Sequence, residues 1–200
     1  MKQLGIGSLV FVGFVSGVFF VYSCGGGGSA VGGGASWPAP VAATGQTTSY
    51  AGSDDGALQA GIAWLSPRYT DNGDATVTDE LTGLIWLQNA NCFGTTTWDN
   101  ALIASDNLAD GQCGLIDGSI AGDWRLPNAR ELTSLVDYGQ YNPSIASGTP
   151  FTGVQSAIYF TSTTFAFNAN IFWGVQFING YTYIETKSIN YYVWPVRGGA

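Results

Sequence analysis

The stretch GDWRLPNARELTSL, residues 122–135, contains the signals for a strand-to-helix junction. Asn128 suits the first cap of a helix, because its side-chain oxygen can accept a hydrogen bond from the free N–H groups of the first turn. Glu131 follows three residues later and completes a capping box, and leucines at three-residue spacing begin an apolar stripe. We predict a helix that starts after Asn128 and that Gly139 ends.

Trp124 and Arg125 precede this helix in a chain that has only six Lys or Arg residues. A charge that rare, next to a tryptophan, predicts an arginine that is substantially buried and paired with a carboxylate or with backbone carbonyls. We assign Trp124, Arg125, Asn128 and Glu131 structural roles. A catalytic role for Glu131 is the alternative.

The composition restricts the possible functions. The 200 residues carry a net charge of −8, with 10% charged and 14% aromatic residues and no histidine. An acidic chain without a basic patch does not favour nucleic acid as a partner. The absence of histidine removes the commonest general base, so we expect no catalytic residues and a protein that is not an enzyme.

The N-terminus predicts export. Lys2 precedes an apolar run over residues 4–22, and Cys24 follows a small residue, as in a bacterial lipobox. We predict a lipoprotein signal peptide over 1–23 and lipid attachment at Cys24; an uncleaved transmembrane anchor is the alternative. Residues 24–40, rich in Gly and Pro, are expected to form a flexible tether, and residues 41–200 the folded domain.

Cys92 and Cys113 remain once Cys24 is assigned to the lipid. An even pair in an exported domain is expected to form a disulfide. A redox-active pair is the alternative, although no CxxC motif and no basic neighbour are present.

Turn signals divide the domain into further elements. Asn-Gly at 72–73 and Thr-Gly at 82–83 predict three short strands, near 67–71, 75–79 and 84–88. Apolar periodicity predicts a helix capped by Thr96 that runs to about Ala109.

The last third of the chain is expected to be rich in strands. Strands are predicted at 157–162 and at 191–196. Asn-Gly at 179–180 predicts a two-residue hairpin loop between 171–178 and 181–186, with Phe177 opposite Thr182. The long connections at 139–156 and 163–170 are candidate binding loops.

The order of motifs resembles the Lcl C-terminal domain family over roughly residues 41–199. The motifs are TGQTTSY (44–50), SDDGALQAG (53–61), PRYTDNGDATVTDELTGLIWLQNANC (67–92), CGLIDGSIAGDWRLPNARELTSLVDY (113–138), YFTSTT (159–164) and YVWPVRGG (192–199). The resemblance implies an α+β, C-type-lectin-like fold, with two helices packed on a twisted antiparallel sheet and long loops. It also implies an exported bacterial surface protein, since relatives are adhesins that bind sulfated polysaccharides.

Two ligand sites are candidates. Asp71, Asp74 and Asp79, with Asn72 between them, could supply oxygen ligands to calcium, and Asp117 with Asp123 forms a weaker group. The alternative for these aspartates is ordinary turn formation, with no cofactor.

A sugar site is the second candidate. It would combine the aromatic and polar side chains of Asn168, Trp173, Tyr181 and Tyr183. The alternative is ordinary sheet packing, because aromatic residues favour strands.

The leading functional hypothesis is a lipid-anchored module of the outer membrane or cell surface that recognises carbohydrate, including sulfated polysaccharide, in adhesion. Its partners would be the membrane, through the N-terminal lipid, and a polysaccharide or surface protein. The alternative is a structural or assembly subunit of the cell surface without a small ligand, for which oligomers are possible.

Overall fold

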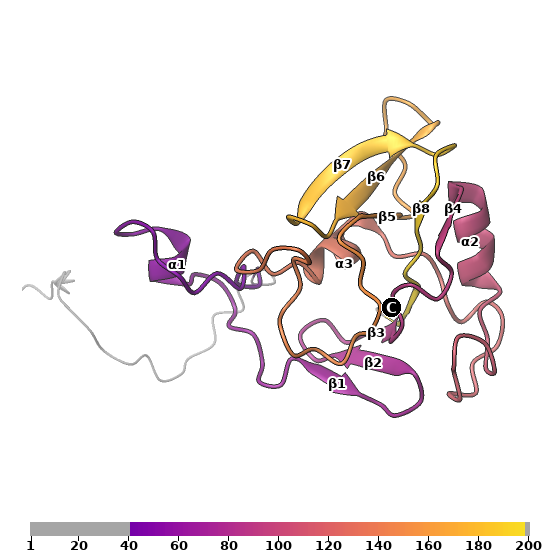
Figure 1. Cartoon of the computed structure of the whole chain (residues 1–200), viewed down its shortest axis with the longest axis horizontal. Coiled ribbons are helices and arrows are strands. Elements are labelled where there is room, and N and C mark those ends of the chain that lie inside the picture. Colours follow the sequence, from indigo (N-terminus) through magenta and orange to yellow (C-terminus); the bar gives the residue numbers. More distant parts are fainter. Residues whose placement is uncertain (1–40, 199–200) are drawn as a thin grey trace, which may run out of the picture. The chain divides into compact units, whose positions relative to one another are not determined.

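The computed structural model describes residues 41–198, which lie in one compact unit, Pro38–Ala200 (Figure 1). The predicted signal peptide, Cys24 and the predicted tether fall outside the described residues. The fold is α+β, with few helices and two sheets that are mainly antiparallel. The helices are α1 (Asp55–Leu58), α2 (Trp98–Asp106) and α3 (Ala129–Ser134). The strands are β1 (Tyr69–Asp71), β2 (Thr76–Asp79), β3 (Leu84–Leu87), β4 (Thr95–Thr96), β5 (Ile158–Tyr159), β6 (Ile171–Gln176), β7 (Tyr181–Thr186), β8 (Tyr191–Tyr192) and β9 (Val196–Arg197).

The first sheet has the order β1-β2-β3-β9 and is antiparallel throughout. Its first three strands confirm the predicted meander to within two residues at each end. Val77 and Trp86 are paired across β2 and β3, and both are fully buried. The sheet therefore buries the large aromatic residue of its third strand.

The second sheet has the order β4-β8-β5-β6-β7, in which β5 and β8 are parallel and the other pairs are antiparallel. The predicted closing strand at 191–196 is wrong, because its two ends belong to different sheets. Trp194 lies between them, is fully buried and donates its indole N–H to the Leu87 carbonyl at 2.8 Å. The chain thus changes sheets where this tryptophan fills the core.

The β6–β7 hairpin forms, but its predicted register is wrong by two residues. Val175 is paired with Thr182 and Gln176 with Tyr181, so the loop spans residues 177–180. Phe177 cannot continue the hairpin because its backbone is already occupied: its N–H donates to Ala157, and its carbonyl accepts from Ser144. A shift of two residues keeps each side chain on its predicted face.

The helices match in part. The capping box of Asn128 and Glu131 is confirmed, with both side-chain hydrogen bonds present. Gly139 does not end this helix, because α3 stops at Ser134 and the chain turns at Leu135. The second helix starts after Thr97 instead of Thr96, and its cap residue makes no side-chain hydrogen bond. The sequence did not predict the four-residue helix α1.

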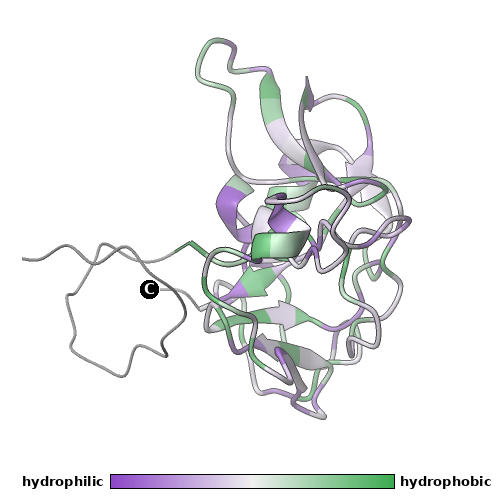
Figure 2. Cartoon of the chain, turned by 90° about the vertical axis from the view of Figure 1, so that its left-hand side faces the viewer, coloured by the Kyte–Doolittle hydropathy of each residue, from purple (hydrophilic) through white to green (hydrophobic). Residues whose placement is uncertain are grey.

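Two apolar clusters lie on opposite faces of the second sheet. Tyr159 and Val175 belong to the larger cluster, which also contains Trp86, Trp124 and Trp194. Phe160 and Phe172 face the other way, into a smaller cluster beside α2. Hydrophobic and hydrophilic segments are mixed along the ribbon (Figure 2). Because β6 contributes Val175 to one cluster and Phe172 to the other, it carries apolar residues on both faces.

The predicted disulfide between Cys92 and Cys113 is confirmed, with 5.8 Å between the two Cα atoms and a sequence separation of 21 residues. The bridge encloses α2, and both cysteines pack against the larger apolar cluster. It therefore fixes the two ends of the segment that carries this helix.

Replacing both cysteines, as in C92S/C113S, should lower the free energy of unfolding by roughly 3 kcal/mol, because the unfolded chain regains the entropy of an open loop. Urea unfolding followed by tryptophan fluorescence measures the change. Wild-type protein kept in reductant is the control and should lose the same amount. An unchanged midpoint in both would contradict the structural role.

Candidate functional site

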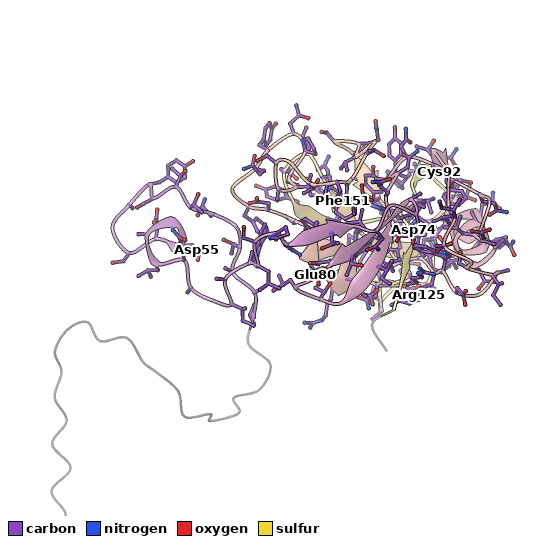
Figure 3. The ribbon with its side chains drawn as sticks, turned by 90° about the horizontal axis from the view of Figure 1, so that it is seen from below. Asp55, Asp74, Glu80, Cys92, Arg125 and Phe151 are labelled. Atoms are coloured by element: carbon purple, nitrogen blue, oxygen red, sulfur yellow. A yellow bond between two sulfur atoms is a disulfide. The ribbon has the colours of Figure 1, made fainter. Side chains whose placement is uncertain are left out.

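Arg125 is paired but not buried, so the predicted burial is wrong. Its guanidinium forms a bidentate salt bridge with the Glu131 carboxylate, with N···O distances of 2.7 and 2.8 Å, and also donates to the Gly198 carbonyl. The side chain keeps 42% of its surface exposed, because it lies at the edge where β9 ends. In Figure 3 the label of Arg125 lies near the labels of Asp74 and Cys92, on the part of the domain that is far from Asp55 and α1. Trp124 beside it is fully buried, as a structural residue should be.

Glu131 therefore has two structural partners. Burial raises the pKa of its carboxyl group, but the hydrogen bonds from Arg125 and from the Asn128 N–H outweigh burial and lower the pKa overall. The same pairing raises the pKa of the Arg125 guanidinium. A carboxylate held ionised by two donors is suited to fixing a helix start, and it is poorly suited to general acid catalysis at neutral pH.

The buried arginine is Arg68. Its guanidinium donates to both carboxylate oxygens of Asp79, at 3.0 and 2.9 Å, and both side chains are almost completely buried. It also donates to the Ser134 carbonyl at the end of α3, at 2.6 Å. The Trp64 ring covers it, with 4.2 Å from the guanidinium carbon to the ring centre. The sequence predicted the two strands near 67–71 and 75–79 as neighbours in a hairpin, but it did not predict that Arg68 pairs with Asp79.

The aspartates proposed for calcium do not come together. Asp79 is paired with Arg68, while Asp71 and Asp74 accept hydrogen bonds from Gly73 and Thr76 within their own turn. In residues 41–198 no group of three His, Cys, Asp or Glu side chains is arranged to hold a metal ion. The three aspartates therefore have separate partners and do not form the predicted calcium site.

The weaker pair of aspartates is also divided between separate partners. The Asp117 carboxylate pairs with Arg197 at 3.0 Å. Asp123 accepts a hydrogen bond from the Ile120 N–H at 2.9 Å. Each carboxylate therefore holds its own part of the chain in place.

The structure splits the predicted sugar-binding residues between two faces of the β6–β7 hairpin. Tyr181 and Tyr183 share one face, with 6.3 Å between their ring centres, and are 60% and 37% exposed. Trp173 faces the opposite side, where it is paired with Ile184 and packs edge-on against Phe165. Asn168 is exposed in the loop before β6 and accepts from the Asn170 N–H. The four residues therefore do not form one site.

Arg130 differs from the other cations of the domain. Arg68, Arg125 and Arg197 are in salt bridges, and Lys187 lies over the Trp98 ring and donates to Thr164. Arg130 is exposed at the start of α3, and in residues 41–198 its side chain has neither an ion pair nor a hydrogen bond. It is thus the cation that is free to meet a ligand.

A concave surface surrounds Arg130. We call it the α3 groove; it has a volume of about 670 Å³ and is lined by, among others, Trp64, Thr82, Arg130, Thr133, Tyr138 and Thr182. The hydroxyl groups of Thr82 and Thr133 donate to Asp79 and to the Ala129 carbonyl, so they face a ligand as acceptors, whereas Thr182 and Tyr138 can donate or accept. Trp64 provides an apolar wall. Thr182 reaches the groove because it lies between Tyr181 and Tyr183 and therefore points to the other face of β7. The sequence did not predict this site, because its residues come from five separate segments.

A family model, the Lcl C-terminal domain, matches residues 75–197. This is more than half of the chain. The chain belongs to the Lcl C-terminal domain family. The motifs quoted from the sequence begin earlier, at residue 44, so the segment that carries Trp64 and α1 precedes the matched part of the Lcl C-terminal domain.

No curated protein matches the chain. Among residues 41–198, no helix combines the length and the apolar character needed to cross a membrane.

The two arginine pairs should differ in their effect on stability. Arg68→Ala leaves the buried Asp79 without a cation and should cost about 3–5 kcal/mol of unfolding free energy. Arg125→Ala removes a pair that is open to solvent and should cost about 1 kcal/mol or less. Chemical unfolding of both variants measures the difference. Equal losses would mean that burial of the Arg68 pair has no special weight.

Proposed function

We propose that this Lcl C-terminal domain is a lipid-anchored surface module that binds polysaccharide and acts in adhesion. In this proposal Cys24 carries the lipid, residues 24–40 are the tether, and the domain has a C-type-lectin-like fold displayed at the outer membrane or cell surface. The observation that carries the proposal is the free Arg130 in a groove lined by hydroxyl groups.

The groove suits an extended, hydroxyl-rich ligand. Sugar hydroxyls can donate hydrogen bonds to the Thr82 and Thr133 hydroxyl oxygens, whose own protons are donated to Asp79 and to the Ala129 carbonyl. A sugar ring can pack its C–H face on an aromatic side chain such as Tyr138. Its volume of about 670 Å³ lies within the range of ligand sites, roughly 300–1,000 Å³. Arg130 favours a sugar that carries a sulfate or carboxylate, because a guanidinium binds such groups through two parallel hydrogen bonds.

The net charge limits this affinity. The chain has a charge of −8, so its overall field repels a polyanion over long distances, and only Arg130 in the α3 groove attracts it. The attraction is therefore expected to be local and sensitive to salt.

Arg130→Gln should weaken binding of dextran sulfate by roughly tenfold, since it removes the one charge-assisted contact. Uncharged dextran should bind the variant and the wild type equally. Immobilised protein and soluble polysaccharide at two salt concentrations provide the measurement. Arg125→Gln, which removes a cation already paired with Glu131, is the matched control and should leave binding unchanged. Equal binding of dextran sulfate by Arg130→Gln and wild type would refute the role of the groove.

A second candidate function, assembly of the cell surface, draws support from β7. This strand has six residues at the edge of its sheet, and Tyr181, Tyr183 and Ile184 are 60%, 37% and 44% exposed. Among the described strands β7 pairs only with β6. The backbone N–H and C=O groups on its other edge can therefore pair with a strand of another chain.

If the strand mediates self-assembly, the full chain should sediment as an oligomer, and Ile184→Lys should return it to a monomer. A charge on an edge strand opposes pairing with another chain. Ile103→Lys is the control, because Ile103 is an exposed apolar residue of α2, away from this edge. A monomeric wild type at all concentrations rules out self-assembly as the function of this edge.

A further inference from the structure

A second concave site lies next to the α3 groove and shares Trp64 with it. We call it the polar pocket; its volume is about 340 Å³, and its lining includes Gln46, Gln59, Trp64, Asp137, Gln140 and Ser147. Residues 43–64 form one wall and residues 137–147 form the other. The hydrogen bond from the Tyr138 N–H to the Thr44 carbonyl, at 3.0 Å, joins the two walls.

Asp137 is the main feature of this pocket. The residue is only 6% exposed, yet its side chain is in no ion pair in the described part of the chain. Its Oδ1 atom accepts from the Gly139 N–H at 2.7 Å, whereas its Oδ2 atom has no hydrogen-bond donor in residues 41–198. The Oδ2 atom is not among the enclosed side-chain atoms of the described residues that lack a partner, so it is open to the pocket and can accept a hydrogen bond from a ligand there.

The surroundings of Asp137 indicate why the oxygen is unused. Gly45 lies so close that any side chain there would collide with the carboxylate, and its φ of +87° also favours glycine. Arg68 is the nearby cation, but its Nε and Nη2 atoms donate to Asp79 and to the Ser134 carbonyl, and its buried Nη1 atom has no hydrogen-bond partner among the described residues. Burial is the main influence on the Asp137 carboxyl and raises its pKa, against the opposing effects of Gly139 and Arg68.

The other side chains are suited to hydroxyl groups. The side-chain amide groups of Gln46 and Gln140 make no hydrogen bond to other described residues, and each can both donate and accept. The indole N–H of Trp64 is fixed on the Ala43 carbonyl at 2.8 Å, which holds its ring as a wall of the pocket. The site thus offers one charged hydrogen-bond acceptor, neutral side chains that can donate or accept hydrogen bonds, and one aromatic surface.

We infer that the polar pocket binds a neutral sugar unit, with Asp137 accepting hydrogen bonds from its hydroxyl groups. A carboxylate in the pocket would repel an acidic sugar, so the preference is opposite to that of the α3 groove around Arg130. The shared Trp64 lies between the two sites. A polysaccharide that crosses it would place an uncharged unit on one side and an acidic unit on the other.

This inference extends the proposed function to a second site and can be tested apart from it. The probes are methyl glycosides of glucose, galactose, mannose and N-acetylglucosamine, none of which has a charge for Arg130. The measurement is a titration of the isotope-labelled full chain by two-dimensional NMR. At least one glycoside should shift the Trp64 indole signal and the amide signals of Gly45 and Gly139.

Asp137→Asn is the principal variant. The asparagine oxygen can still accept from the Gly139 N–H, so the turn should persist, and the melting temperature at neutral pH should not fall, because a buried charge is removed. Affinity for the active glycoside should fall by roughly tenfold or more. Gln140→Ala, in the same wall of the pocket as Asp137, should weaken binding as well.

The controls separate the two sites. Arg130→Gln should bind the glycoside as the wild type does, even if the groove binds no polysaccharide. The inference is overturned if no glycoside shifts the Trp64 signal at tens of millimolar, if Asp137→Asn binds equally well, or if lysine methyl ester binds in place of the sugars. The last result would identify an ammonium site.

Discussion

The buried pair of Arg68 and Asp79 connects the parts of this domain that sequence distance separates. Asp79 accepts from Arg68, the Leu81 N–H and the Thr82 hydroxyl, which fixes the turn between β2 and β3. Arg68 in turn holds the end of α3 through Ser134 and lies under the Trp64 ring. Trp64 is a wall of both concave sites, so their geometry depends on an ion pair that touches no ligand.

The two sheets share one core because Trp194 bridges them. Its ring contacts Trp86 of the first sheet and Tyr159 and Phe177 of the second, with ring centres 5.6–5.7 Å apart. Aromatic side chains bury large areas, which suits a domain with so few charges. Aromatic side chains therefore fill the region where β5, β8 and β9 meet. The two concave surfaces and the exposed edge strand lie away from this point, on α3, along residues 43–64 and on β7.

Some local features could be predicted because neighbouring residues decide them. The capping box needs only Asn128 and Glu131 at the right spacing, and the β1–β2 turn needs Asn72 and Gly73. The predicted hairpin register was wrong for the opposite reason: Ser144, far away in sequence, donates to the Phe177 carbonyl, and the Phe177 N–H donates to Ala157, so the backbone of Phe177 is not free to continue the hairpin. The prediction that Arg125 is buried was also wrong, because the small number of charged residues in a chain does not determine which arginine is enclosed.

The sequence by itself determined the family, the disulfide pair, the meander of β1–β3 and the start of α3, since these depend on motif order or on residues a few positions apart. Tertiary structure alone decided which arginine is buried, which is free, and where the concave surfaces lie. The α3 groove and the polar pocket combine residues from separate segments, such as Trp64, Arg130 and Asp137. Exposure and pairing of a charge depend on what packs around it, and local sequence does not contain that information.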